Sequence, residues 1–353
     1  MVPYLTIALL IIVSNILFYK KSNFNLFGYT ILFGSLFLLS VIRDISVGRD
    51  FQYYADSFKM IGQYPFHHWK SQFILSKNEY GWYIMNKFFY LYGTFFLYTL
   101  CFYFVMYFLI FKSILDKSSI PLFSLLIYFF CGFYFASFNI MRQVLVFSLF
   151  LYAIRFIESG EFYKYSTILI VGALFHISAL FLIPLYFIKN IKWSRTALII
   201  LILVSLLLGY SNFILRITPY IHLVRLNHYI NIMHKEISFF GYLIFAVSTT
   251  IAIIFLLFSK DINSTGSLYL KFVVFGIIMS NLVMHFQWLF RFSEVYFAPL
   301  MIIGYINVVS ECKSNSNKYL LSSLLLVYSF LLFYLALANN SNGIIPYKLI
   351  FSS

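Results

Sequence analysis

Long apolar runs separated by short polar segments recur from one end of the chain to the other. Most are close to the length of about 20 residues that a helix needs to cross a hydrocarbon core of roughly 30 Å. A membrane-spanning segment must pair its own backbone N–H and C=O groups, so the runs predict helices. The predicted spans are residues 2–18, 25–41, 94–115, 119–136, 140–157, 196–214, 238–258, 268–287, 291–310 and 318–338.

The pattern therefore predicts an all-α fold, a polytopic transmembrane helical bundle of about 10–12 membrane helices. We expect residues 1–353 to form a single integral membrane domain with two larger outer loops, 42–80 and 215–237. Residues 81–92 have too few apolar side chains to cross alone and predict an amphipathic helix at the interface. Composition agrees, because 62% of the residues are hydrophobic and 10% are charged, against about 25% charged in a soluble domain.

The net charge of +14 does not indicate nucleic acid, because lysines and arginines stand singly at the ends of apolar runs. Basic residues in such positions usually mark cytoplasmic loops. Lys20 and Lys21 follow the first span, which places that loop inside and the N-terminus outside. The loop 42–80 is then outside.

Segment 162–188 decides the sidedness of the rest of the chain. If it crosses once, the loop that carries Lys189 and two later basic loops, at Lys260 and Lys318, fall outside, against the usual rule. If it enters the membrane and returns, with its turn near His176, those loops lie inside and both loop 215–237 and the C-terminus lie outside. We favour this re-entrant pair of half-helices, and a single span kinked by Pro184 is the alternative.

Two Arg-Asp pairs, Arg43-Asp44 and Arg49-Asp50, occur where the second span reaches the outer interface, and Glu79 lies further along the same loop. A structural interpretation is a solvated loop with locally neutralised charges. A functional one is that these carboxylates and guanidiniums frame a polar site at the membrane surface.

Arg142 stands between two apolar stretches with hardly any loop available. It either snorkels to the interface or faces a polar cavity, where a guanidinium in the first turn of a helix can bind phosphate. His176 lies far from any charged flank, so it is either a hydrogen-bonded core residue or a group that contacts substrate oxygens or carries protons. Arg291 and Glu294 can form an ion pair on one helical face, yet an intramembrane charge is also a candidate site.

Metal ligands are not indicated. The second outer loop carries Arg216, Arg225 and three histidines, His222, His228 and His234, whose spacing does not suit zinc on a helix. Cys101, Cys131 and Cys312 show no ligand or disulfide spacing, and adjacent acidic pairs for a divalent ion are missing. We expect no metal and no cofactor.

Several short motifs together resemble the EpsG family of Wzy-type polysaccharide polymerases over most of the chain. They occur in family order and spacing, although Arg49 stands where the family usually has threonine. The matching pieces are Arg43-Asp44, Gly48 with Asp50, Tyr53-Tyr54, Glu79-Tyr80-Gly81, Asn139 with Met141-Arg142-Gln143, Phe175-His176-Ile177-Ser178-Ala179-Leu180, Arg291 with Tyr296-Phe297, and Pro346-Tyr347.

The resemblance implies an enzyme that joins undecaprenyl-diphosphate-linked oligosaccharide units into capsular, exo- or O-antigen polysaccharide. The site would lie on the outer, periplasmic side of the plasma membrane. The other expected partners are the bilayer, a chain-length regulator and a flippase of the same pathway. The expected catalytic residues are Asp50, Glu79 and His176. The expected diphosphate or substrate ligands are Arg43, Asp44, Tyr54, Arg142, Arg291 and Tyr296.

Two rival functions fit a polytopic chain with outward charges. A flippase or transporter of lipid-linked oligosaccharide would carry charged residues through the membrane depth and on both sides, whereas here they gather near one face. A membrane O-acyltransferase acting on polysaccharide would need a polar cytoplasmic entrance for its acyl donor, and the sequence shows no such cluster.

Overall fold

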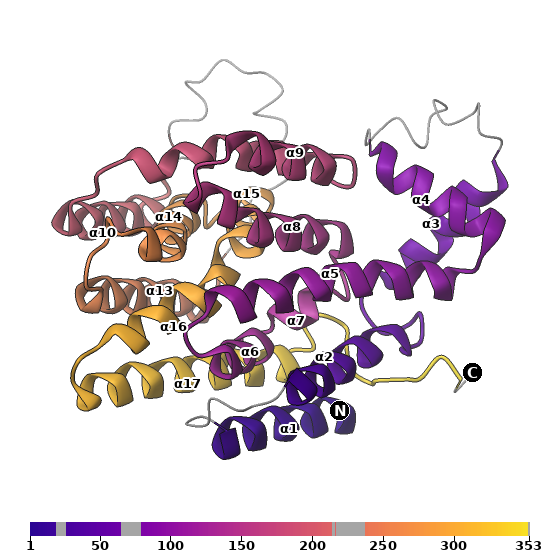
Figure 1. Cartoon of the computed structure of the whole chain (residues 1–353), viewed down its shortest axis with the longest axis horizontal. Coiled ribbons are helices and arrows are strands. Elements are labelled where there is room, and N and C mark those ends of the chain that lie inside the picture. The colour runs from indigo at the N-terminus through magenta and orange to yellow at the C-terminus, as the bar shows by residue number, and fades with distance from the viewer. Residues whose placement is uncertain (19–25, 65–78, 214–215, 217–236, 352–353) are drawn as a thin grey trace. The chain divides into compact units, whose positions relative to one another are not determined.

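The computed structural model describes residues 1–18, 26–64, 79–213, 216 and 237–351 (Figure 1). Regular structure in these ranges is helical without a strand, and an isolated antiparallel bridge joins Arg43 to Leu349. The all-α prediction is confirmed. The chain divides into two compact units, one formed by residues 1–188 with 326–353 and the other by residues 189–325.

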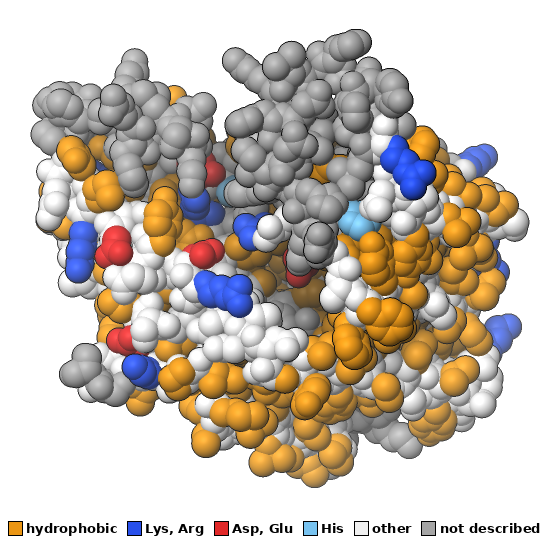
Figure 2. All heavy atoms as spheres, turned by 180° about the vertical axis from the view of Figure 1, so that it is seen from behind, with side chains coloured by type: hydrophobic (Ala, Val, Ile, Leu, Met, Phe, Trp, Pro, Cys, Tyr) orange, Lys and Arg blue, Asp and Glu red, His pale blue; other side chains and the backbone are white. Residues whose placement is uncertain are grey.

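Four helical segments in the described ranges are long and apolar enough to cross a membrane: Phe95–Lys117, Phe239–Phe258, Leu289–Glu311 and Asn315–Ala338. Shorter apolar helices accompany them, including α1 (Val2–Phe18) and α10 (Arg195–Tyr210). Apolar side chains cover large continuous areas of the surface in Figure 2. A soluble protein rarely exposes such areas, so the surface suits a membrane protein.

In the first unit, α5 (Phe95–Lys117) packs against both α2 (Leu26–Val41) and α8 (Met141–Glu158), and α1 packs against α6 (Pro121–Phe130). Buried hydroxyl groups join α2 to α5: the Ser40 Oγ lies 2.7 Å from the Tyr107 hydroxyl. Such a hydrogen bond satisfies polar atoms that would be costly to bury unpaired.

Two predicted spans are interrupted. The span predicted at 119–136 ends as α6 at Phe130, because Gly132 adopts a positive φ of 80°, and the short α7 (Phe133–Ala136) follows. The span predicted at 291–310 is divided into α15 (Gln287–Tyr296), η5 (Ala298–Leu300) and α16 (Met301–Glu311). Pro299, which lacks a backbone N–H, stands at this second break.

The structure shows the predicted turn within 162–188, whereas re-entry of this hairpin into the membrane stays a prediction. The hairpin consists of α9 (Phe162–Ala173), a turn, and the 3-10 helix η2 (Ile177–Asn190). The Tyr165 hydroxyl donates to the Leu182 carbonyl at 2.6 Å, so the two arms lie side by side and a kinked single span is wrong. The turn contains His176, as expected.

The chain between α2 and α5 contains two helices, α3 (Phe51–Gln63) and α4 (Tyr80–Tyr92), the second of which confirms the expected helix at 81–92. The Lys87 ammonium donates to the carbonyls of Gly62 at 2.5 Å and Tyr64 at 2.7 Å, at the end of α3. Cations stabilise this end of a helix. These hydrogen bonds therefore fasten α4 to the C-terminal end of α3.

The chain after α17 (Asn315–Ala338) returns to the loop between α2 and α3 (Figure 1, yellow). The backbone N–H of Asp44 donates to the Lys348 carbonyl at 2.9 Å, and the Tyr347 hydroxyl donates to the Leu39 carbonyl at 2.8 Å. The C-terminal segment thereby lies against the loop that carries the two Arg-Asp pairs.

In the second unit, α14 (Leu268–Leu282) packs against α10, α16 and α13 (Phe239–Phe258). The Asn281 amide donates to Ser205 Oγ at 3.3 Å and to Thr249 Oγ1 at 3.0 Å. One buried amide thus joins α14 to both α10 and α13, as polar side chains do between membrane helices.

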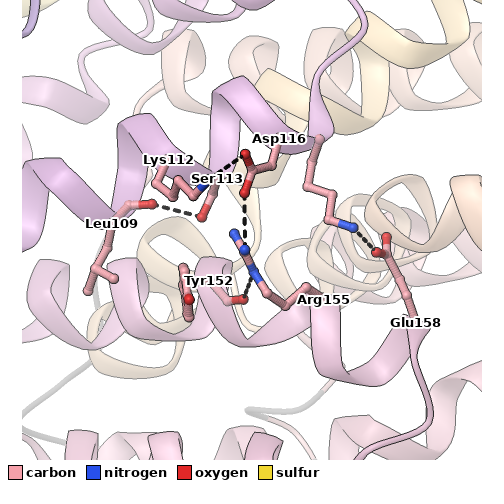
Figure 3. A network of polar contacts seen from close by, with 8 residues as sticks. Leu109, Lys112, Ser113, Asp116, Tyr152, Arg155 and Glu158 are labelled. Atoms are coloured by element: carbon pink, nitrogen blue, oxygen red, sulfur yellow. Dashed lines mark hydrogen bonds and ion pairs between the residues drawn. The ribbon is translucent and has the colours of Figure 1, made fainter. Parts of the chain in front are cut away.

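A network of ion pairs joins the C-terminal ends of α5 and α8 (Figure 3). The Arg155 guanidinium donates to Asp116 at 3.0 Å, and Lys112 donates to the other oxygen of Asp116 at 2.9 Å. Lys117 pairs with Glu158 beside them. Arg142 lies in the first turn of the same α8, about 20 Å from Arg155 along the helix at 1.5 Å per residue.

Candidate functional site

The central feature of the candidate site is an ion pair between Glu79 and Arg142. Glu79 stands directly before α4, and Arg142 lies in the first turn of α8. The two side chains are only 6% and 14% exposed. Charges so well shielded from water are stable only when they are paired, so each holds the other in place.

The first turn of α4 docks on the hairpin turn, and this contact places Glu79. The backbone N–H groups of Gly81 and Trp82 both donate to the Leu174 carbonyl, at 2.8 Å and 3.2 Å. A Cβ on Gly81 would lie 2.8 Å from the Leu174 Cβ, so only glycine permits this approach. The Trp82 ring lies 5.3 Å from the Arg142 guanidinium carbon, within cation–π range.

His176 lies beside Glu79. Its Nε2 is 4.0 Å from the Glu79 carboxylate, and its Nδ1 is 2.6 Å from Ser178 Oγ. The backbone N–H of Ser178 also donates to Nδ1 at 3.3 Å, which favours the neutral tautomer with the proton on Nε2. The proton-bearing nitrogen is then the one nearest Glu79.

Asp50 and Tyr54 belong to the start of α3. Asp50 precedes the helix and makes no capping hydrogen bond with its side chain. Burial raises the pKa of Tyr54 to about 12; the positive charge of Arg142 opposes this effect and the negative charge of Asp50 adds to it. The Tyr54 hydroxyl therefore lies near enough to both charged residues for their charges to act on it. The Tyr54 ring lies 5.3 Å from that of Trp82.

Arg43 is 1% exposed and surrounded by protein. Its guanidinium donates to the carbonyls of Ser40 at 2.9 Å and Val47 at 3.1 Å and to the Tyr103 hydroxyl at 2.7 Å. It also lies 3.7 Å from the centre of the Phe51 ring. These contacts give Arg43 a structural role, holding the loop between α2 and α3 against α5.

The Asp44 carboxylate makes its hydrogen bonds within its own loop. One carboxylate oxygen accepts from the Ser46 hydroxyl at 2.6 Å and from the Ser46 backbone N–H at 2.9 Å. These hydrogen bonds lower the pKa of Asp44 and keep it ionised. Asp44 is thus occupied locally, in contrast to Asp50.

Arg291 and Tyr296 lie on α15 of the second unit. Tyr296 is fully buried with its ring 4.9 Å from that of Phe292, and α15 is fastened to α14 by a hydrogen bond of 2.6 Å from Ser293 to the Gly276 carbonyl. A diphosphate or substrate contact for Arg291 and Tyr296 stays a prediction. His222, Arg225, His228 and His234 fall outside the described residues, and Arg216 is exposed.

The structure brings together Asp50, Tyr54, Glu79, Arg142 and His176 in the first unit. The sequence interpretation gave no role to Trp82, whose only signal was its place directly after the Glu79-Tyr80-Gly81 motif. Among the residues that the structure describes, no group of three or more His, Cys, Asp or Glu side chains is placed to hold a metal ion.

Residues 26–349, nearly the whole chain, match the sequence profile of the EpsG family. No curated protein and no solved structure matches the chain.

Proposed function

We propose that this chain, which belongs to the EpsG family, joins undecaprenyl-diphosphate-linked oligosaccharide units on the outer face of the plasma membrane. The family consists of Wzy-type polymerases, and membership indicates a role in polysaccharide polymerisation. At the level of residues the proposal rests on one observation. The buried Glu79–Arg142 pair, with His176, Tyr54 and Asp50 around it, is assembled from segments far apart in the sequence.

The proposed reaction is a glycosyl transfer. A hydroxyl oxygen of the incoming lipid-linked unit forms a bond to the sugar carbon that links the growing chain to diphosphate. The bond from that carbon to the diphosphate oxygen breaks, undecaprenyl diphosphate leaves with the bonding electrons, and the hydroxyl proton passes to a carboxylate. Catalysis then needs positive charge on the leaving diphosphate and a base near the acceptor.

Arg142 is the proposed diphosphate ligand. It combines a planar guanidinium with the first turn of α8, whose N-cap residue Ile140 makes no side-chain capping bond, and backbone N–H groups in such a turn can bind an anion. The Arg142 Nε is buried and makes no hydrogen bond to the described residues. Glu79 holds the guanidinium through the ion pair, so it orients Arg142 and is a weaker candidate for the base.

Asp50 is the proposed base. A base needs a lone pair that is not already engaged, and the Asp50 carboxylate makes no capping bond at the start of α3. It is partly exposed, so an acceptor hydroxyl can reach it. His176 is proposed to contact the acceptor sugar or the diphosphate through its Nε2–H.

The test is polymer formation in detergent from lipid-linked repeat units purified from cells that lack this gene. Asp50→Asn should lose about 10²- to 10⁴-fold in rate, as expected for a general base. Arg142→Lys should lose much of the activity although the charge is kept, because lysine cannot bind two phosphate oxygens in one plane. Arg155→Lys is the matched control, since Arg155 lies at the opposite end of the same helix.

The proposal predicts longer glycan chains and free undecaprenyl diphosphate from the parent protein and from the Arg155 variant. A flippase would move the units across vesicle membranes without joining them. An acyltransferase would alter them only when an acyl donor is supplied. Either result, or full activity in both Asp50→Asn and Arg142→Lys, would overturn the assignment.

A further inference from the structure

We propose that Asn139 is a positioning residue that fixes Asp50 relative to Arg142, and that the C-terminal segment 340–345 helps Asn139 to hold the loop that carries Asp50. The inference rests on the function proposed above. Asn139 lies in the turn between α7 and α8, is 9% exposed, and contacts segments far from it in the sequence.

The Asn139 amide uses both of its polar atoms. Its Oδ1 accepts from the backbone N–H of Arg49 at 2.6 Å. Its Nδ2 donates to the Asn342 carbonyl at 3.1 Å and to the Asn342 side-chain oxygen at 3.0 Å. One side chain therefore joins the outer loop to the C-terminal segment, and a buried amide satisfied in this way holds its neighbours rigidly.

Close backbone packing surrounds this amide. Gly48 has a φ of 102°, and its N–H donates to the Gly343 carbonyl at 2.8 Å. A Cβ on Gly48 would lie 2.7 Å from the Phe138 carbonyl oxygen. Gly48 must be glycine for both reasons. The peptide that precedes Asp50 is thus enclosed between the Asn139 turn and the C-terminal segment.

The C-terminal segment is itself held in a defined turn. The Asn340 side chain donates to the Ile345 carbonyl at 2.7 Å and accepts from the Ile345 N–H at 3.0 Å. The Asn340 carbonyl also lies 3.4 Å from a guanidinium nitrogen of Arg49. This closed turn presents the Asn342 and Gly343 carbonyls at fixed positions toward the loop that carries Asp50.

The consequence for the site follows from chain order. Arg49, which the Asn139 amide holds, directly precedes Asp50, and Asn139 stands just before the helix that carries Arg142. The amide thus couples the proposed base to the proposed diphosphate ligand. A misplacement of about 1 Å between reacting groups can cost about 10²-fold in rate.

The experiment compares Asn139→Ala with Asn15→Ala in the polymerisation assay, at equal amounts of folded protein. Asn15 is a matched control: it is also 9% exposed, and its amide donates to the Leu122 carbonyl at 3.0 Å, joining α1 to α6 away from the site. We expect Asn139→Ala to lower kcat by about 10- to 100-fold while KM for the lipid-linked units stays within about threefold. Asn15→Ala should keep the parent kcat.

A double-variant cycle separates positioning from general damage. If Asn139 acts through Asp50, the protein with both Asn139→Ala and Asp50→Asn should be about as active as Asp50→Asn alone, because the effects of coupled residues do not add. The inference fails if the losses multiply in full or if Asn139→Ala behaves like Asn15→Ala. A parent protein that forms no polymer would instead refute the proposed function, so the two failures are distinguishable.

Discussion

Replacement of Glu79 by methionine tests whether the buried ion pair holds the candidate site together. Methionine matches the length of glutamate without its charge, so Glu79→Met leaves the Arg142 guanidinium without its partner. That guanidinium is 14% exposed and cannot regain full hydration. The structure therefore predicts a loss of stability in addition to a loss of activity.

The expected size of the loss follows from the burial of both groups. Two unit charges in contact attract by about 4 kcal/mol at an effective dielectric constant of about 20. Removing one partner of a buried pair typically costs about 3–5 kcal/mol. Because Glu79 is 6% and Arg142 14% exposed, solvent screening reduces this value only slightly. For a folding unit of about 200 residues the loss corresponds to a Tm lower by roughly 6–20 °C.

The assay is thermal unfolding of the purified protein in detergent, followed by loss of the monodisperse species after heating. The variants are Glu79→Met, Arg142→Met and the protein with both changes. Each single change should lower Tm, whereas the double change should recover most of the loss, because no uncompensated charge remains. The double variant should still form no polymer, since the proposed diphosphate ligand is missing.

Two results would refute this reasoning. An unchanged Tm for Glu79→Met would mean that the Arg142 guanidinium does not depend on the ion pair. A double variant that loses as much as the two single variants together would mean that the two side chains act independently and are not paired.

Three further predictions follow. Gly81→Ala should reduce polymer formation by displacing Glu79, because a Cβ there would lie 2.8 Å from the hairpin, whereas Gly34→Ala meets nothing within 4 Å and should be neutral in the same assay. Tyr165→Phe should lower stability by about 1–3 kcal/mol, because it leaves a buried hairpin carbonyl without its donor, and thermal unfolding in detergent measures this. With an impermeant maleimide on intact cells, Ser46→Cys should react and Ser314→Cys should not; the reverse pattern would contradict the proposed sidedness.

The hairpin at 162–188 shows which structural features the distribution of charged residues can predict. The distribution of Lys189 and the later basic residues predicted that the segment turns back near His176, and the Tyr165–Leu182 hydrogen bond confirms it. The same pattern could not predict the break at Gly132, because glycine occurs both inside helices and, with a positive φ, at their C-terminal ends.

The residues of the candidate site, likewise, could be predicted from the sequence only in part. Arg142 and His176 were recognisable because charged or titratable side chains in apolar surroundings need a partner, and Glu79 because it is one of few carboxylates in its polar loop. The sequence shows these residues one at a time. Their contacts join α4, α8 and the hairpin turn. Asn139 appeared in the sequence only as part of the motif before Arg142, and its role came from contacts that join the loop at Arg49 to the C-terminal segment.

The sequence alone determined that the chain is helical and suited to a membrane, because the length and composition of apolar segments are local properties that lipid imposes directly. It also supplied the motifs of the EpsG family. Only the tertiary structure decided which charged groups pair: Arg43 is enclosed by Ser40, Val47 and Tyr103, whereas Arg142 faces Glu79. Both are arginines at helix ends, and their difference arises from contacts between segments distant in the chain, which no local pattern encodes.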